Sequence, residues 1–141
     1  MKGHVLDASA LYRFLTGRPG ADIVGRLMKE ARDEGASLRM SVVNWGEVYY
    51  AMARSRGFSE TARVMERVKL LPLMILDADE PVVMRAAQLK AGYGLPYADC
   101  FAAATTGRGE VLVTSDAKDF QKVPELKLLA LPEHKGKGRN K

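Results

Sequence analysis

Short apolar runs alternate along the chain with longer stretches of helical apolar spacing, and this alternation limits the fold more than any other feature. Strand-like runs are expected at residues 5–6, 37–41, 71–76, 111–113 and 127–129. Helical patterns lie between them, at residues 8–15, 22–34, 43–56, 59–70, 79–90, from Ala98 to a stop at Gly107 or Gly109, and in a short turn over 118–120. Strands that alternate with helices need crossover connections, which produce parallel pairing. The sequence therefore predicts an α/β fold, a three-layer α/β/α sandwich with a mostly parallel central sheet.

Individual residues mark where these elements begin and end. Asp22 is expected to cap the second helix, and Gly35 and Gly57 are expected to end the second and third helices. Pro72 lacks the N–H that a central strand needs, so the third strand should lie at an edge of the sheet or begin at Leu73. There is no internal repeat and no linker, so a single domain is expected.

The composition narrows the class of protein. The 141 residues are 47% hydrophobic and 28% charged, which suits one packed core with a solvated surface. No apolar run approaches the ~20 residues that span a bilayer, and the first residues lead into a strand rather than a signal peptide, so we expect a cytoplasmic protein without a membrane segment. The single cysteine, Cys100, excludes an intramolecular disulfide and a multi-cysteine zinc site. A bound metal would therefore need oxygen ligands.

The basic charge is concentrated at the end of the chain. Of the 22 lysine and arginine residues, four lie in residues 134–141, which contain no acid. The rest of the chain holds 18 basic against 17 acidic residues and is nearly neutral. We therefore expect one domain over residues 1–132 and a short basic tail over 133–141. The tail would serve either as a solvated end or as an arm that attracts phosphates.

Several kinds of catalysis lack the side chains they need. The two histidines are His4, at the start of an apolar strand, and His134, in the tail, so a histidine acid and base pair is disfavoured. A serine or cysteine nucleophile would have no evident base, and no G-x-S-x-G elbow occurs. The glycine-rich motifs G-x-x-x-x-G-K-[ST] and G-x-G-x-x-G are also absent. Carboxylates remain as the groups that could carry chemistry.

Four carboxylates stand out by their positions. Asp7 and Asp116 follow expected strands, where open α/β sheets bind ligands, while Glu47 and Asp99 interrupt apolar helical patterns. Each has a structural alternative: Asp7 and Asp116 could be helix caps, Asp99 could interact with the helix dipole, and Glu47 could reach solvent at the edge of its helix. Taken together, the four positions favour one shared site. Six other acids on polar faces or in loops are expected to be solvated: Asp22, Asp33, Glu34, Glu60, Glu66 and Glu110.

Four segments around these acids resemble the motifs of PIN domains, in particular those of VapC-type toxins from toxin–antitoxin pairs. The segments are residues 5–11, 41–48, 95–104 and 113–120. The similarity keeps the expected order and spacing over residues 4–132, and a Val123-Pro124 turn precedes the final strand. One such motif would be weak support, whereas four in register are fairly specific.

The resemblance implies a PIN fold and a divalent-metal-dependent ribonuclease that acts as a toxin and is held inactive by a cognate antitoxin. It also implies a homodimer. Carried over by position, Asp7, Glu47, Asp99 and Asp116 would form an acidic quartet. Four further residues would be polar neighbours of this quartet or contact metal or substrate: Ser9, Asn44, Thr114 and Asp119.

The expected chemistry fits these residue types. Oxygen ligands suit Mg²⁺ and Mn²⁺. With one ion activating a water and a second stabilising the leaving oxygen, hydrolysis of RNA needs no protein base and leaves 5′-phosphate and 3′-hydroxyl ends. Asp7 and Asp99 would bind the principal ion, and Asp116 and Glu47 would orient the water or a second ion.

Three other interpretations remain open on the sequence. A phosphoreceiver domain would need paired acids after the first strand, which Leu6-Asp7-Ala8 lacks, although Asp77 and Lys118 could fill its other positions. A haloacid-dehalogenase-like phosphatase would need Asp-x-Asp, where this chain has Ser9 at the second place. An RNA-binding PIN module without catalysis is disfavoured by the complete acidic quartet.

Overall fold

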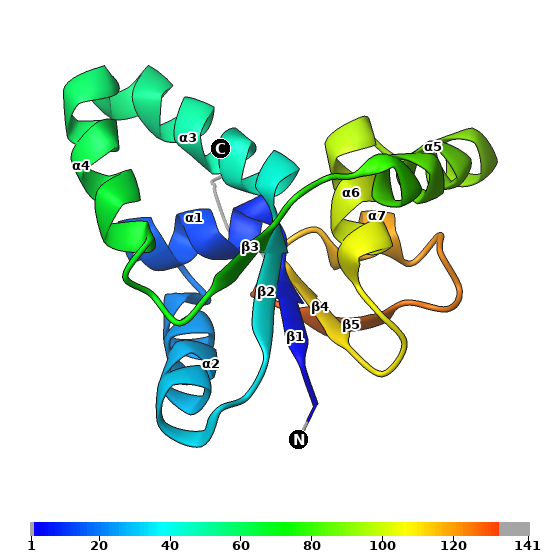
Figure 1. Cartoon of the computed structure of the whole chain (residues 1–141), viewed down its shortest axis with the longest axis horizontal. Helices are drawn as coiled ribbons and strands as arrows, with labels where there is room; N and C mark the ends of the chain where they lie inside the picture. The colour runs from blue at the N-terminus through cyan, green and yellow to red at the C-terminus, as the bar shows by residue number, and fades with distance from the viewer. Residues whose placement is uncertain (1, 133–141) are drawn as a thin grey trace.

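The computed structural model describes residues 2–132, which form one five-stranded sheet with seven surrounding helices (Figure 1). The strands are β1 (His4–Leu6), β2 (Leu38–Ser41), β3 (Met74–Leu76), β4 (Val111–Thr114) and β5 (Lys127–Ala130). Their order in the sheet is β3-β2-β1-β4-β5, and every pairing is parallel. The predicted α/β sandwich with a parallel sheet is thereby confirmed. The basic tail predicted for residues 133–141 lies outside the described residues.

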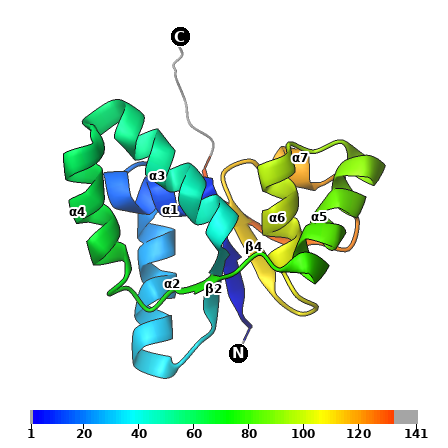
Figure 2. The ribbon, with the colours of Figure 1, turned by 45° about the horizontal axis from the view of Figure 1, so that its top comes forward.

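The helices cover the two faces of the sheet in two groups. They are α1 (Ala8–Thr16), α2 (Ala21–Glu34), α3 (Val42–Arg56), α4 (Phe58–Val68), α5 (Glu80–Tyr93), α6 (Tyr97–Thr105) and α7 (Ala117–Phe120). Helices α1 to α4 lie on one side and α5 to α7 on the other, as Figures 1 and 2 show. Helix α3 also contacts α6 across the ends of the strands. Within residues 2–132, no helix has both the length and the apolar character that crossing a bilayer requires.

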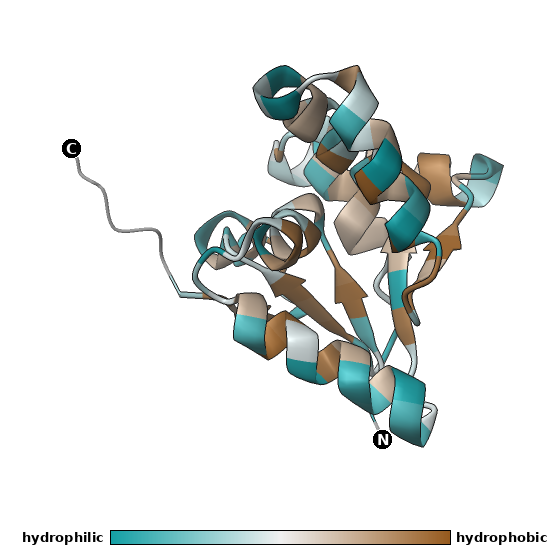
Figure 3. Ribbon diagram, turned by 90° about the vertical axis from the view of Figure 1, so that its left-hand side faces the viewer, coloured by the Kyte–Doolittle hydropathy of each residue, from teal (hydrophilic) through white to brown (hydrophobic). Residues whose placement is uncertain are grey.

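Consecutive residues of the central strands pack into two separate hydrophobic cores, one on each face of the sheet. Leu6 and Val113 belong to the core beneath α1 to α4, whereas Val5 and Leu112 belong to the core beneath α5 to α7. This alternation follows from the pleat, which points successive side chains to opposite faces. Figure 3 shows the strands mostly in the colours of hydrophobic residues and the helices with mixed faces. A sheet buried on both sides explains why these runs are continuously apolar.

Two local expectations are settled by the structure. Asp22 does not cap α2, because the helix begins one residue earlier and its N-cap is Gly20, which makes no side-chain capping bond. Gly20 has φ of 97°, and a Cβ there would lie 3.0 Å from the Leu131 side chain. Both the backbone angle and the close contact therefore require glycine. Pro72 restricts β3 as expected, since this strand lies at the sheet edge and begins at Met74.

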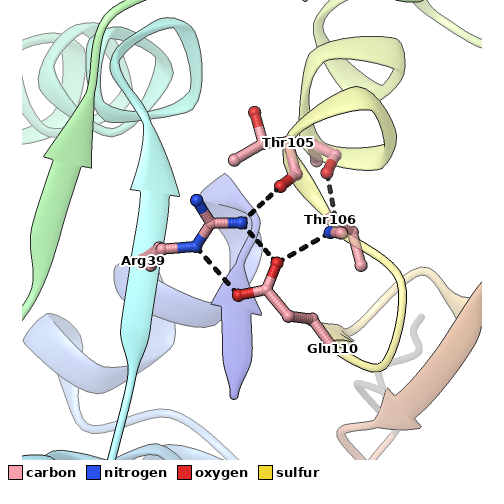
Figure 4. Close-up of polar contacts among 6 residues, drawn as sticks. Arg39, Thr105, Thr106 and Glu110 are labelled. Carbon is pink, nitrogen blue, oxygen red and sulfur yellow. Dashed lines mark hydrogen bonds and ion pairs between the residues drawn. The ribbon is translucent and has the colours of Figure 1, made fainter.

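An ion pair closes the N-terminal end of the sheet (Figure 4). Arg39 of β2 donates two hydrogen bonds to Glu110, just before β4, and one to the Thr105 carbonyl at 2.9 Å. The Gly107 N–H also donates to Glu110 at 2.7 Å. Burial acts to raise the pKa of Glu110, but the bonds from Arg39 and Gly107 and the charge of Arg39 leave it lowered. The expectation that Glu110 is solvated is thus wrong, since its side chain is only 16% exposed.

Candidate active site: carboxylates at the strand ends

The first and fourth acidic motifs meet because β1 and β4 are neighbours in the sheet. Leu6 pairs with Val113, so Asp7 and Asp116 leave the sheet at the same carboxyl edge. In open parallel sheets this edge is where ligands bind. The pairing of β1 with β4 therefore brings these two motifs, which lie far apart along the chain, to one place.

Asp7 is both a helix cap and a buried acid of this cluster. It is 3% exposed, and its Oδ1 accepts hydrogen bonds from the Ala10 N–H at 2.9 Å and the Ser9 hydroxyl at 2.6 Å. The Ser9 hydroxyl in turn accepts from the Ser115 N–H at 3.0 Å. Ser9 therefore links the end of β1 to the segment that carries Asp116. The capping alternative holds for Asp7, but a cap alone does not require burial of the charge.

Glu47 is positioned by a buried asparagine. The Asn44 Nδ2 donates to Glu47 Oε1 at 2.9 Å and to the Ala98 carbonyl at 3.0 Å, so it ties α3 to the start of α6. Asn44 is 1% exposed, and its Oδ1 is buried without a hydrogen-bond partner among the described residues. Because Nδ2 faces two acceptors, the orientation of the amide is fixed.

Asp99 lies where the acids converge, in the first turn of α6. Burial, and then the charges of Asp7, Glu47, Asp116 and Asp119, together raise its pKa to about 7. Burial likewise raises the pKa of Asp7 to about 6 against the hydrogen bonds from Ser9, Thr114 and Ala10. The placement of the four predicted acids rests on contacts: β1 and β4 pair side by side before Asp7 and Asp116, and Asn44 joins Glu47 to the residue before Asp99.

Asp116 and its neighbours form the outer side of the cluster. Asp116 makes no side-chain cap bond to α7, and its N–H donates to the buried Thr114 hydroxyl at 2.8 Å. Burial and the charge of Asp119 raise the pKa of Asp116, while Arg13 lowers it. Asp119 is exposed, in the first turn of α7. The sequence interpretation did not include Arg13, because nothing in its local pattern distinguishes it from other surface arginines.

The donor set suits a hard divalent cation. The four carboxylates supply only oxygen atoms, which Mg²⁺ and Mn²⁺ prefer. Over residues 2–132, no three His, Cys, Asp or Glu side chains are already close enough to hold an ion directly. A Mg²⁺ ion that retains several waters needs few direct protein ligands. The residues therefore fit such an ion.

Residues 4–126 match the sequence model of a family described as PIN domain. No curated protein matches the chain. The part of the chain that matches contains all four members of the predicted quartet.

Three solved structures illustrate the similarity of fold. A DNA-bound VapBC from Salmonella typhimurium has a TM-score of 0.74 at 20% identity and covers 92% of this chain and 98% of its own. VapBC2 from Rickettsia felis, bound to a promoter DNA fragment, has 0.70 at 17% identity, with the same coverages. FitAcB from Neisseria gonorrhoeae has 0.66 at 20% identity and covers 89% of this chain and 96% of its own. Each comparison extends over nearly the whole length of the solved chain.

Proposed function

Because this chain belongs to the PIN domain family, we propose that it is a divalent-metal-dependent endoribonuclease. The observation that supports the proposal is the placement of the acids: Asp7 and Asp116 follow neighbouring strands, and Asn44 joins Glu47 to the residue before Asp99. An array of unpaired acids at a strand edge is unfavourable for folding, and such arrays are typical of functional sites.

The positions of the side chains suggest a separate role for each acid. Asp7 and Asp99 would hold the principal Mg²⁺ or Mn²⁺, and Glu47 and Asp116 would orient the attacking water or a second ion. The bound cation supplies Lewis acidity for hydrolysis of the phosphodiester and makes a protein base unnecessary. Ser9 fixes one oxygen of Asp7 through its 2.6 Å bond.

Two neighbours would keep this geometry in place. Asn44 holds Glu47 at 2.9 Å, and Thr114 fixes the backbone of Asp116. Such supporting bonds orient carboxylates that bind metals. Asp119, exposed beside Asp116, would contribute charge at the entrance of the site.

The biological role that we propose is that of a toxin in a toxin–antitoxin pair. The support is the resemblance of the four motifs to VapC-type toxins, together with the fold shared with VapBC structures over about nine-tenths of the chain. The partners would be RNA as substrate, a cognate antitoxin as inhibitor and a second copy of this chain, acting in the cytoplasm. Co-expression with the product of a neighbouring small reading frame should relieve growth arrest if this role is correct.

The strand order disfavours the phosphoreceiver alternative. Asp77, its candidate phosphoacceptor, follows the edge strand β3, and β2 separates that strand from β1. Asp77 therefore does not follow a strand that adjoins Asp7, as a shared Mg²⁺ site would require.

The central experiment measures RNA cleavage by the purified protein with Mg²⁺, with Mn²⁺ and with EDTA. We expect cleavage in either ion, no cleavage in EDTA, and products with 5′-phosphate and 3′-hydroxyl ends. Glu66→Gln, on an exposed face of α4, serves as the matched control and should behave as wild type. Undiminished cleavage in EDTA would refute the mechanism.

A further inference from the structure

A shallow hollow between α1 and α3 adjoins the carboxylate cluster. It has a volume of about 200 Å³, and Ser9 and Glu47 form the side that it shares with the cluster. The remainder of the lining is apolar or aromatic: Ala8, Tyr12, Val48, Tyr50 and Ala51. Hydrolysis of a phosphodiester does not in itself require this apolar surface, so the hollow calls for a separate explanation.

Tyr50 and Tyr12 each lie one helical turn after another residue that lines the hollow. On α3, Glu47 and Tyr50 are three residues apart, which places them on one face of the helix. On α1, Ala8 and Tyr12 are four residues apart and share a face in the same way. Tyr50 is 51% exposed, so about half of its surface is open to a ligand.

An arginine guanidinium also lies close to each of these two rings. The Arg18 guanidinium lies 5.0 Å from the centroid of Tyr12, and that of Arg54 lies 5.9 Å from the centroid of Tyr50. Both arginines are exposed, and neither joins an ion pair in the part of the chain that the structure describes. Positive charge therefore flanks a hollow that lies beside a strongly acidic cluster.

We propose that this hollow is a base subsite, in which an unpaired nucleobase next to the cleaved phosphate stacks on Tyr50 and Tyr12. The proposal rests on the ribonuclease function proposed above. Arg18 and Arg54 would hold the phosphates on either side of that base. Stacking on aromatic rings and arginine contacts to phosphates are the usual means of holding single-stranded RNA.

The negative charge of the site explains why a base subsite would help it to bind RNA. Four carboxylates carry more negative charge than one divalent ion compensates, so neutral surfaces and cations at the rim would add to the affinity for RNA. A duplex keeps its bases stacked inside the helix and cannot place one in the hollow. The subsite therefore selects single-stranded segments, and a contact with another protein is the competing use of the same surface.

The first test compares Tyr50→Ala with Tyr50→Phe on an unstructured RNA oligonucleotide in Mn²⁺. Loss of a stacked base should lower kcat/KM about 5- to 150-fold for Tyr50→Ala, which corresponds to ~1–3 kcal/mol, while Tyr50→Phe should stay within about twofold of wild type. Tyr93→Ala, an exposed tyrosine at the end of α5, is the matched control and should leave kcat/KM unchanged. Equal rates for Tyr50→Ala and wild type would overturn the subsite.

A second test identifies the base. Abasic nucleotides are placed one at a time on either side of the mapped cleavage point. At one position the abasic change should slow the wild-type protein but cause no further loss in Tyr50→Ala, because both changes remove the same contact. Losses that multiply at every position would show that no base rests on Tyr50 and would overturn the proposal.

Binding measurements separate failure of the subsite from failure of the ribonuclease function. Fluorescence anisotropy of the same oligonucleotide on Asp99→Asn, with and without Tyr50→Ala, reports the stack without turnover, and Tyr50→Ala should weaken Kd at least about fivefold. If the wild type does not cleave but this Kd effect is present, the subsite stands and the proposed hydrolysis fails. If cleavage is normal, Kd is unchanged and Tyr50→Ala instead lowers the sedimentation coefficient, the hollow is a contact between copies and the subsite fails.

Discussion

The carboxyl groups at the two ends of the central sheet have opposite electrostatic environments. At the N-terminal end, Arg39 contacts Glu110 directly, and the pKa of that carboxyl is lowered. At the carboxyl end, burial raises the pKa of Asp7 to about 6 and that of Asp99 to about 7. Neither of these two acids is in an ion pair among the described residues.

This difference distinguishes a structural from a functional use of the same side chains. A paired carboxylate favours the folded state at neutral pH, whereas a cluster of like charges opposes it. The unfavourable end is the one where a parallel sheet binds ligands. Repulsion that an added cation would relieve is therefore evidence about function, and the ion pair at the other end provides an internal control.

The largest expected effect is on catalysis. Asp99→Asn or Asp7→Asn should lower kcat/KM at least about 100-fold, because loss of metal charge stabilisation is worth several kcal/mol. Asparagine still caps helices, so Asp7→Asn should keep α1 intact. Glu110→Gln, at the opposite end, should retain wild-type kcat/KM at a temperature where it is folded. Similar losses in all three variants would mean that the two ends do not differ as proposed.

The next effect is on stability and depends on pH and metal. A carboxyl whose folded pKa is raised contributes most favourably below its unfolded pKa near 4, and this contribution is lost as pH rises to about 7 for Asp99. Metal-free Asp99→Asn should therefore have a higher Tm than wild type at pH 7.5, and the difference should shrink toward pH 4.

Metal provides the complementary measurement. An ion that binds only the folded state adds about 2.7 kcal/mol at 100 times its Kd, and Asp99→Asn should reduce the Mn²⁺-induced rise in Tm. Calorimetry with and without Mn²⁺ at both pH values measures each quantity. A variant that is less stable without metal and keeps the full Mn²⁺ shift would make Asp99 a structural helix residue.

The fold and the site differ in how far the sequence predicts them. Strand and helix positions follow from periodicity, and the errors concern ends, as at Asp22, where the helix is capped by Gly20, which packs closely on Leu131. That contact joins residues 111 positions apart along the chain. No local pattern around Asp22 contains it.

The sequence predicts the site acids from their positions and from the resemblance, but it does not predict their surroundings. Asp7 and Asp116 follow strands, and adjacency of β1 and β4 decides that they meet. Glu110 appears as an ordinary loop acid until β2 and β4 bring Arg39 beside it. The arrangement of the strands thus brings Arg39 to Glu110 at one end of the sheet but, within residues 2–132, brings no such partner to Asp7 or Asp99 at the other end.

The ion pair itself should have a smaller energetic effect than the metal site. Its side chains are 27% and 16% exposed, so the pair lies between surface and buried cases, and removing one partner should cost about 1–3 kcal/mol. Urea unfolding of Glu110→Gln, Arg39→Met and the double variant measures the coupling. If the single losses simply add, the pair contributes nothing beyond its separate contacts and the control end of the comparison is lost.

The smallest expected effect concerns the basic residues that follow the carboxyl edge. Pro132, the last described residue, has its carbonyl bound by Arg13, whose charge also lowers the pKa of Asp116. Pro132 therefore lies beside the acidic cluster, and residues 134–141 of the sequence carry four positive charges.

If these charges contact single-stranded RNA, deleting residues 134–141 should reduce the slope of log Kd against log salt concentration by up to about 3, at ~0.7 per neutralised phosphate. Titrations of Asp99→Asn with an RNA oligonucleotide at several salt concentrations give this slope without cleavage. Replacing the four basic residues by glutamine at constant length separates charge from length. An unchanged slope would make the tail a solvated end and would confine cation contacts with RNA to the folded domain.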